Sequence, residues 1–138
     1  MNILFICKHN RFRSKVAEAL FRYHYKGDSV KAKSAGLTID VMRPYVSRNV
    51  QSALKEKGVS IRDDGALKID SFMLKWADRA IIVADNISPD MFRDKEMLGN
   101  KPVDFWGISD CSETDISGIC KRVDEIEKKV LELIKTLN

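Results

Sequence analysis

The residues of this chain with the clearest chemical potential form one short run, Cys7-Lys8-His9-Asn10-Arg11-Phe12-Arg13-Ser14. A cysteine thiolate is a nucleophile, and an arginine can donate two parallel hydrogen bonds to two oxygens of one phosphate. Ser14 could donate its hydroxyl to the Cys7 sulfur and help to hold its charge. The run therefore contains a nucleophile, a charge clamp and a donor for the thiolate, the parts that phosphoryl transfer to a cysteine needs.

The segments on either side of this run indicate how it is positioned. Residues 2–6 read as a short buried strand, and from Ser14 onward apolar residues recur at helical spacing. A loop that leads into a helix N-terminus meets free N–H groups and the positive end of the helix dipole, which favour an anion. The sequence therefore predicts a phosphate-binding loop made of Lys8, His9, Asn10, Arg11, Phe12 and Ser14, with Cys7 and Arg13 as catalytic residues. The alternative is a buried structural Cys7 with Arg13 in a surface ion pair.

The rest of the chain alternates between strand and helix patterns. Strands are predicted at residues 30–34, 80–84 and 102–106, and helices at 46–58, 70–76, 91–98 and 115–137. Such alternation predicts an α/β fold with a parallel sheet, as one domain over residues 1–138. Right-handed crossovers place the loop after the first strand at the carboxyl edge of the sheet, where such folds bind ligands.

Composition narrows the classes of protein that fit. A chain of 138 residues with 44% hydrophobic and 32% charged residues is expected to be globular, and no apolar run is long enough to span a bilayer. Three cysteines form no disulfide framework, and the short apolar N-terminus does not read as a secretion signal, so a cytoplasmic location is predicted. The net charge of +4 suits an anionic partner. We expect no nucleic acid, membrane, metal or cofactor to be involved.

Further segments carry a resemblance to a known family: Val16-Ala17-Glu18-Ala19, Ser34-Ala35-Gly36, Leu54-Lys55-Glu56-Lys57-Gly58-Val59, Ile82-Val83-Ala84-Asp85 and Ile108-Ser109-Asp110. With the run from Cys7 to Ser14, the chain resembles the low-molecular-weight protein tyrosine phosphatases and the related thioredoxin-coupled arsenate reductases over nearly its whole length. The resemblance implies a three-layer fold, a four-stranded parallel sheet in the order 2-1-3-4 flanked by helices. It also implies that Cys7 is the nucleophile and Arg13 binds phosphate, while Asn10 and Ser14 shape the loop and steady the thiolate.

Three positions of the loop depart from the family pattern. His9 stands where the family usually has glycine, and it either covers the rim of the loop or takes part in catalysis. Phe12 replaces a cysteine, which removes the usual partner for reversible oxidative protection of Cys7. Arg11 replaces a small or apolar residue beside the substrate pocket. It either selects a second negative charge on the substrate or points at solvent, and both roles stay open.

A phosphomonoester leaving group needs a proton, and three aspartates of the late stretch could supply it: Asp104, Asp110 and Asp115. By resemblance the general acid is Asp110, with a solvated loop carboxylate as the alternative. Asp85 is either a supporting acid beside the loop or a turn cap.

The family follows its acid with proline and often with aromatic residues, whereas Cys111 and Ser112 stand here. Trp106 or Tyr45 could supply the missing aromatic wall, or could simply pack in the core or at the rim.

The sequence thus predicts a phosphatase that hydrolyses phosphomonoesters, by resemblance protein phosphotyrosine, through a phosphocysteine. Its substrate would be a phosphorylated protein or a small aryl phosphate, and its product inorganic phosphate. One alternative is an arsenate reductase of the same fold. Arsenate reductases of this fold carry two further cysteines after the third strand, whereas residues 84–99 of this chain contain no cysteine. Cys111 could replace the missing protective cysteine of the loop, in a disulfide with Cys7, if their Cα atoms lie within about 7 Å. Cys120 reads as buried in the last helix. A phosphate- or phosphoprotein-binding module with little turnover is the other alternative.

Overall fold

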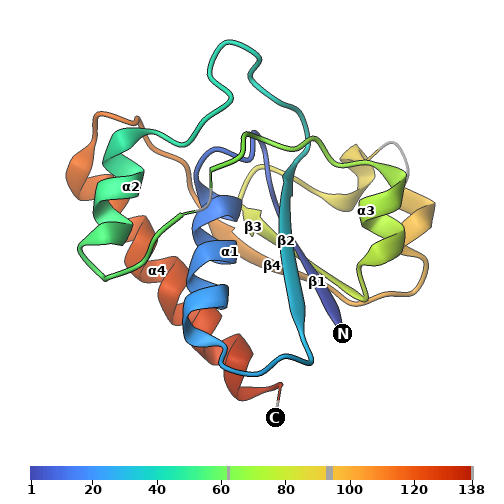
Figure 1. Ribbon diagram of the computed structural model, residues 1–138. Helices are drawn as coiled ribbons and strands as arrows, with labels where there is room; N and C mark the ends of the chain where they lie inside the picture. Colours follow the sequence, from blue (N-terminus) through green and yellow to red (C-terminus); the bar gives the residue numbers. More distant parts are fainter. Residues whose placement is uncertain (62, 93–94, 138) are drawn as a thin grey trace.

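A parallel sheet of four strands forms the centre of the structure, a computed structural model that describes residues 1–61, 63–92 and 95–137 (Figure 1). The strands are β1 (Asn2–Cys7), β2 (Lys31–Gly36), β3 (Arg79–Ala84) and β4 (Val103–Ile108). They lie in the order β2-β1-β3-β4, and each neighbouring pair is parallel. The α/β class predicted from the sequence and the strand order implied by the family resemblance are both confirmed.

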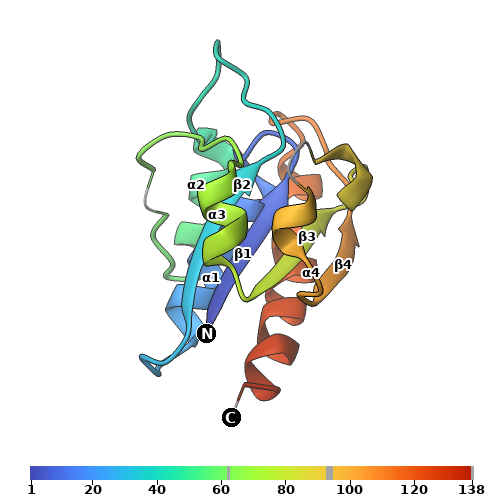
Figure 2. The ribbon, with the colours of Figure 1, turned by 90° about the vertical axis from the view of Figure 1, so that its right-hand side faces the viewer.

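Helices cover both faces of this sheet, as Figures 1 and 2 show. The α-helices are α1 (Arg13–His24), α2 (Arg48–Lys55), α3 (Ser71–Trp76) and α4 (Ile116–Lys135), and two 3-10 turns are η1 (Pro89–Met91) and η2 (Lys95–Leu98). Helices α1, α2 and α4 pack on one face of the sheet, and α3 with the 3-10 turns packs on the other. Among the described residues no helix is both long and apolar enough to cross a membrane.

Strand β1 is buried on both faces because its side chains alternate between two cores. Ile3 and Phe5 face α1 and α4, whereas Leu4 and Ile6 face α3. The ring of Trp106 lies 5.6 Å from that of Phe5, so this tryptophan packs against the core. A strand so enclosed is held rigidly, and the residue at its carboxyl end, Cys7, is positioned with it.

Helix caps and strand pairing determine where several of these helices and strands begin or end. Asp70 and Asp115 cap α3 and α4, their carboxylates accepting from Met73 N at 2.8 Å and Gly118 N at 3.0 Å. The second strand begins one residue later than predicted and extends to Gly36, because its pairing with β1 continues to Cys7.

The helix predicted at residues 91–98 is instead two short 3-10 turns, and positions 93 and 94 of that prediction lie outside the described residues.

Candidate active site

The segment between β1 and α1 forms a loop at the carboxyl edge of the sheet, where the sequence placed it. Cys7 is the last residue of β1 and is 2% exposed. Helix α1 follows at Arg13, and its N-cap residue, Phe12, provides no capping side chain. The first N–H groups of a helix have no partner within the helix, so this end is open to an anion.

Buried hydrogen bonds beneath the loop fix the direction of the Ser14 hydroxyl. The backbone N–H of Leu67 can only donate, and it donates to Asn10 Oδ1 at 2.9 Å, which orients the Asn10 amide. Asn10 Nδ2 therefore donates to Ser14 Oγ at 2.8 Å. Because that bond uses Ser14 Oγ as an acceptor, the Ser14 hydroxyl hydrogen is free to point at Cys7 Sγ, 2.9 Å away. The arrangement can stabilise a negative charge on the sulfur.

The same amide connects the loop to β2. Asn10 Nδ2 also donates to Ser34 Oγ at 3.0 Å, and the Ser34 hydroxyl in turn donates to Glu18. Asn10 has a φ of 54°, a left-handed conformation that asparagine tolerates better than most residues. Gly36 allows the end of β2 to lie close to the backbone of this loop, because a Cβ at Gly36 would lie 2.8 Å from Asn10 N. Ser34 and Glu18 lie in segments that carry the family resemblance, but the sequence assigned them no role at the site, since that role depends on the pairing of β2 with β1.

Arg13 is 3% exposed and is held from the side of β3 and β4. Its Nη1 donates to the carbonyl of Ile108 at 2.8 Å and lies 3.5 Å from Asp85 Oδ1. Its Nη2 lies 3.5 Å from Asn86 Oδ1. Two roles were open for Asp85, a supporting acid beside the loop or a turn cap. The structure shows Asp85 as a partner of the Arg13 guanidinium, which corresponds to the supporting acid. Arg13 lines the pocket described next, so its guanidinium is both anchored and available to an anion there.

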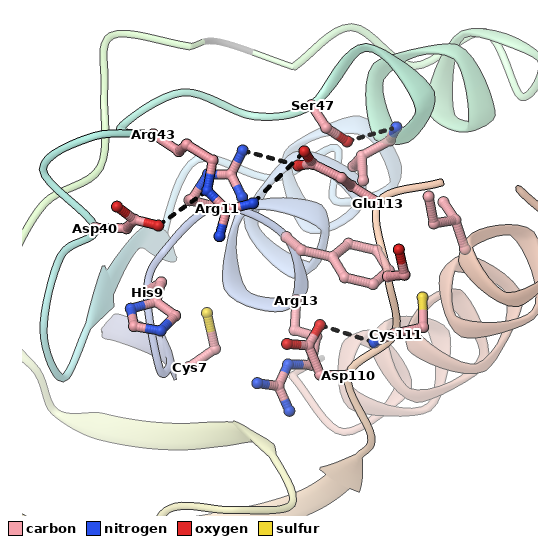
Figure 3. A pocket seen from close by; sticks show the side chains of 14 residues that line it. Cys7, His9, Arg11, Arg13, Asp40, Arg43, Ser47, Asp110, Cys111 and Glu113 are labelled. Carbon is pink, nitrogen blue, oxygen red and sulfur yellow. Dashed lines mark hydrogen bonds and ion pairs between the residues drawn. The ribbon is translucent and has the colours of Figure 1, made fainter. Parts of the chain in front are cut away.

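A pocket of about 230 Å³ opens over the loop (Figure 3). Its predicted members are Cys7, His9, Arg11, Phe12, Arg13 and Asp110; the others are Asp40, Arg43, Ser47, Val50, Cys111, Ser112, Glu113 and Ile119. Asn10 and Ser14 lie fully buried beneath the pocket instead of lining it. Lys8 is exposed, and its carbonyl accepts from Thr38 N at 2.9 Å, which pins the loop to the segment after β2.

The three candidate acids are separated by the fold. Asp110 is exposed at the pocket, and its Oδ1 accepts from Cys111 N at 2.9 Å (Figure 3). Asp104 instead accepts from Arg79 Nε at 2.8 Å on the neighbouring strand, and Asp115 caps α4. Of the three, only Asp110 lines the pocket.

Arg11 does not point into solvent. Its side chain is 18% exposed, and it donates through Nε to the Tyr45 carbonyl at 3.0 Å and through Nη2 to Glu113 Oε2 at 3.1 Å. Arg43 Nη1 lies 3.6 Å from the other oxygen of Glu113, and Arg43 Nε donates to Asp40 at 3.0 Å. That hydrogen bond from Arg43 holds the pKa of Asp40 below its ordinary value.

No sequence pattern pointed to Arg43, Glu113 or Asp40, because each lies in an irregular loop.

His9 and the aromatic wall are the remaining features of the rim that the sequence raised. The His9 ring lies beside Cys7 in Figure 3, and its Nδ1 lies 3.3 Å from Thr38 Oγ1. Among the described residues that line the pocket, Phe12 carries the one benzene ring, and none carries an indole. Tyr45 and Trp106 are not part of this lining. Of the roles open for Trp106 and Tyr45, neither residue supplies an aromatic wall to the pocket, and Trp106 packs in the core as the other role implied.

All three cysteines are free. Cys111 lies on the pocket wall across from Cys7 (Figure 3), and burial raises the pKa of its thiol. Cys120 is partly buried in α4 against the main core, as its sequence context indicated.

The fold and the pocket together define a class of α/β protein in which a cysteine, an arginine and a helix N-terminus meet at the end of the first strand. The chain belongs to the low molecular weight phosphotyrosine protein phosphatase family, whose model matches residues 2–138. The resemblance seen in the sequence is thereby confirmed, and the chain is a member of an enzyme superfamily.

Relatives in this superfamily carry more than one activity in their names. An arsenate reductase of Brevibacillus brevis is 34% identical over 137 residues, which cover 97% of this chain and 94% of that protein. The YwlE arginine phosphatase from Geobacillus stearothermophilus is similar in structure, with a TM-score of 0.85, 24% identity and coverage of 99% and 92% of the two chains. An arsenate reductase from Archaeoglobus fulgidus gives a TM-score of 0.76 at 28% identity, covering 96% and 98%.

Proposed function

We propose that this protein is a cysteine-dependent phosphatase that hydrolyses phosphomonoesters, protein phosphotyrosine among them, through a phosphocysteine intermediate. The observation that supports it most is the contact of 2.9 Å between Cys7 Sγ and Ser14 Oγ, in a loop that opens on an uncapped helix N-terminus. Its substrate would be a phosphorylated protein or a small aryl phosphate, and its product inorganic phosphate. With three free cysteines, we place it in the cytoplasm.

In the first step the Cys7 thiolate attacks phosphorus. A bond forms between sulfur and phosphorus, and the ester bond between phosphorus and the leaving oxygen breaks. Arg13 and the N–H groups of residues 8–14 hold the equatorial oxygens as their charge develops. Asp110 gives its proton to the leaving oxygen, which departs as an alcohol or phenol.

In the second step water attacks the phosphocysteine. The Asp110 carboxylate takes a proton from the water, the bond between sulfur and phosphorus breaks, and Cys7 leaves as a thiolate. The hydroxyl of Ser14 stabilises that thiolate, and Asn10 keeps the hydroxyl in place. Inorganic phosphate is released, and the starting protonation states are restored.

Hydrolysis of 4-nitrophenyl phosphate and of a phosphotyrosyl peptide, in the presence of a chelator, tests the proposal. Wild-type protein should turn over both, and Cys7→Ser should be inactive while still binding phosphate, because the amides and Arg13 remain. Cys120→Ser is the matched control and should stay active, since Cys120 lies in α4 and does not line the pocket. Equal activity of Cys7→Ser and wild type would overturn the mechanism. Phosphate binding without turnover by the wild type would favour a binding module.

Arsenate reduction is the second candidate, favoured by the names of the relatives and by the position of Cys111 in the pocket. It would need a further thiolate to attack a Cys7 adduct, and burial, by raising the pKa of Cys111, keeps that thiol largely protonated near neutral pH. We therefore rank it second. Thioredoxin-dependent reduction of arsenate that is lost in Cys111→Ser would reverse the ranking.

A further inference from the structure

One carboxylate at the mouth of the pocket lies between two arginines. Glu113 Oε2 accepts from Arg11 Nη2 at 3.1 Å, and Glu113 Oε1 lies 3.6 Å from Arg43 Nη1 (Figure 3). The three residues come from three separate loops, the phosphate-binding loop, the segment after β2 and the segment after β4. A planar anion is thus already bound by two guanidinium groups beside the phosphate-binding loop.

Both arginines are held by partners other than Glu113. Arg11 Nε donates to the carbonyl of Tyr45 at 3.0 Å, and Arg43 Nε donates to Asp40 Oδ2 at 3.0 Å. If Glu113 moved away, each guanidinium would keep a hydrogen bond to a partner of its own. The two arginines therefore form a preorganised anion site, and preorganisation lowers the cost of binding a ligand there.

Glu113 is suited to be an exchangeable occupant of that site. Its side chain is 41% exposed, so water can reach and solvate the carboxylate when it leaves. Exposed ion pairs contribute little to stability, which makes a purely structural role a weak reason for this arrangement. Without the Glu113 charge, the two positive charges of Arg11 and Arg43 exceed the single negative charge of Asp40, which leaves a net charge of +1. An anion from the substrate would be attracted to the place that Glu113 vacates.

We propose that Arg11 and Arg43 form a second anion subsite, that Glu113 occupies it in the free protein, and that the preferred substrates are phosphomonoesters carrying a second acidic group close to the phosphoryl group. The proposal rests on the proposed phosphatase function and narrows its substrate class. It also explains why the family's small or apolar residue is replaced by Arg11.

Binding to Cys7→Ser separates this proposal from catalysis. Titration calorimetry should give a tighter Kd for 3- or 4-carboxyphenyl phosphate than for phenyl phosphate, by about three- to tenfold, since a charged hydrogen bond is gained while Glu113 is displaced. Two phosphotyrosyl peptides, with glutamate or glutamine on both sides of the phosphotyrosine, form the second arm. A preference in the first arm points to small dianionic substrates, and one in the second arm alone points to acidic protein segments.

Variants test the subsite itself. Arg43→Gln should bring the ratio of the two Kd values close to one, and Arg43 is 58% exposed, so the variant should fold. Glu113→Gln should increase the ratio, because it removes the internal competitor. Arg48→Gln is the matched control: it removes one exposed positive charge from the start of α2, outside the pocket, and should leave the ratio unchanged.

Two results would overturn the subsite. One is equal binding of carboxylated and plain phosphates in both arms. The other is a preference that Arg43→Gln and Arg48→Gln reduce equally, which would show a general effect of net charge. Tight binding of phenyl phosphate to Cys7→Ser without hydrolysis by the wild type would count against the proposed function alone.

Discussion

The position of Arg13 in this pocket is set by groups at the ends of two strands. Its guanidinium is fixed by the Ile108 carbonyl at 2.8 Å and by a carboxylate, Asp85, at 3.5 Å. Both anchors lie at the carboxyl ends of β4 and β3, so the sheet itself orients the clamp. An arginine restrained in this way loses little side-chain entropy when it binds a phosphate.

The identity of the proposed general acid can be tested by comparing substrates that differ in their leaving groups. Asp110→Asn should slow hydrolysis of phenyl phosphate by about 10²–10⁴, the range typical of general acid catalysis. Esters with good leaving groups, such as 4-nitrophenyl phosphate, need less protonation, so their cleavage step should slow much less. The measurement is the ratio of cleavage rates for the two esters in single-turnover experiments.

Two asparagine variants provide the controls for that experiment. Asp115→Asn should preserve the N-cap of α4, because asparagine caps helices as well as aspartate does. Asp104→Asn loses only its pairing with Arg79. Both should show the wild-type leaving-group ratio. If either variant changed that ratio while Asp110→Asn did not, the acid would have been assigned to the wrong residue.

Sequence information was strongest for residues whose role depends on their neighbours in the chain. Cys7, Arg13 and Ser14 lie in one run that extends from the end of a strand to the start of a helix, so their meeting could be predicted. Glu113 and Arg43 could not be connected in that way, because they approach Arg11 only after three loops fold together. Irregular loops have no periodicity, and their contacts depend on tertiary packing.

At the scale of elements, Asn10 joins the phosphate-binding loop to two other segments. Its amide contacts Ser14, Ser34 and the Leu67 N–H, and its backbone is left-handed. Asn10→Ala should destabilise the fold by about 3–5 kcal/mol, because it leaves buried polar groups unpaired and alanine is strained at a positive φ. Urea denaturation would measure the change in the free energy of unfolding.

The same substitution at an exposed asparagine gives the comparison. Asn100 lies in an exposed turn before β4, and Asn100→Ala should change the free energy of unfolding by less than about 0.5 kcal/mol. Similar losses for the two variants would mean that the buried amide does not hold the loop.

The elements themselves were largely predictable, because each has a clear apolar pattern. Strands β1 and β3 are fully buried runs, and α4 begins and ends close to the expected residues. The prediction was least accurate before β4, where two 3-10 turns replace a continuous helix. A segment that short contains too few turns for periodicity to distinguish the helix types.

For the molecule as a whole, one ion-pair cluster connects the three helices on the same face of the sheet. Glu127 of α4 accepts from His24 of α1 at 2.9 Å and from Lys57, just after α2, at 2.9 Å. Lys57 also pairs with Asp124 at 2.8 Å. Hydrogen bonds from Lys57 to Asp124 and Glu127 raise the pKa of Lys57 above its ordinary 10.5. Burial raises the pKa of Glu127, but the hydrogen bonds from Lys57 and His24 outweigh that effect, and the pKa of Glu127 lies below its ordinary 4.5.

These shifts predict how the stability of the fold depends on pH. Glu127, with a lowered pKa, stabilises the folded state above pH 4.5 and loses that contribution as pH falls through its folded pKa. Lys57, with a raised pKa, contributes fully below pH 10.5 and loses its contribution as pH rises above that value. Glu127→Gln should therefore be about 1 kcal/mol less stable than wild type at pH 7, and the difference should shrink as the pH is lowered below 4.5. Urea denaturation at a series of pH values from 7 to about 3 measures this difference, with Glu132→Gln on the exposed side of α4 as the matched control. The control should match wild type throughout, and a Glu127→Gln deficit that stayed constant with pH would show that the charge of Glu127 does not stabilise the helices.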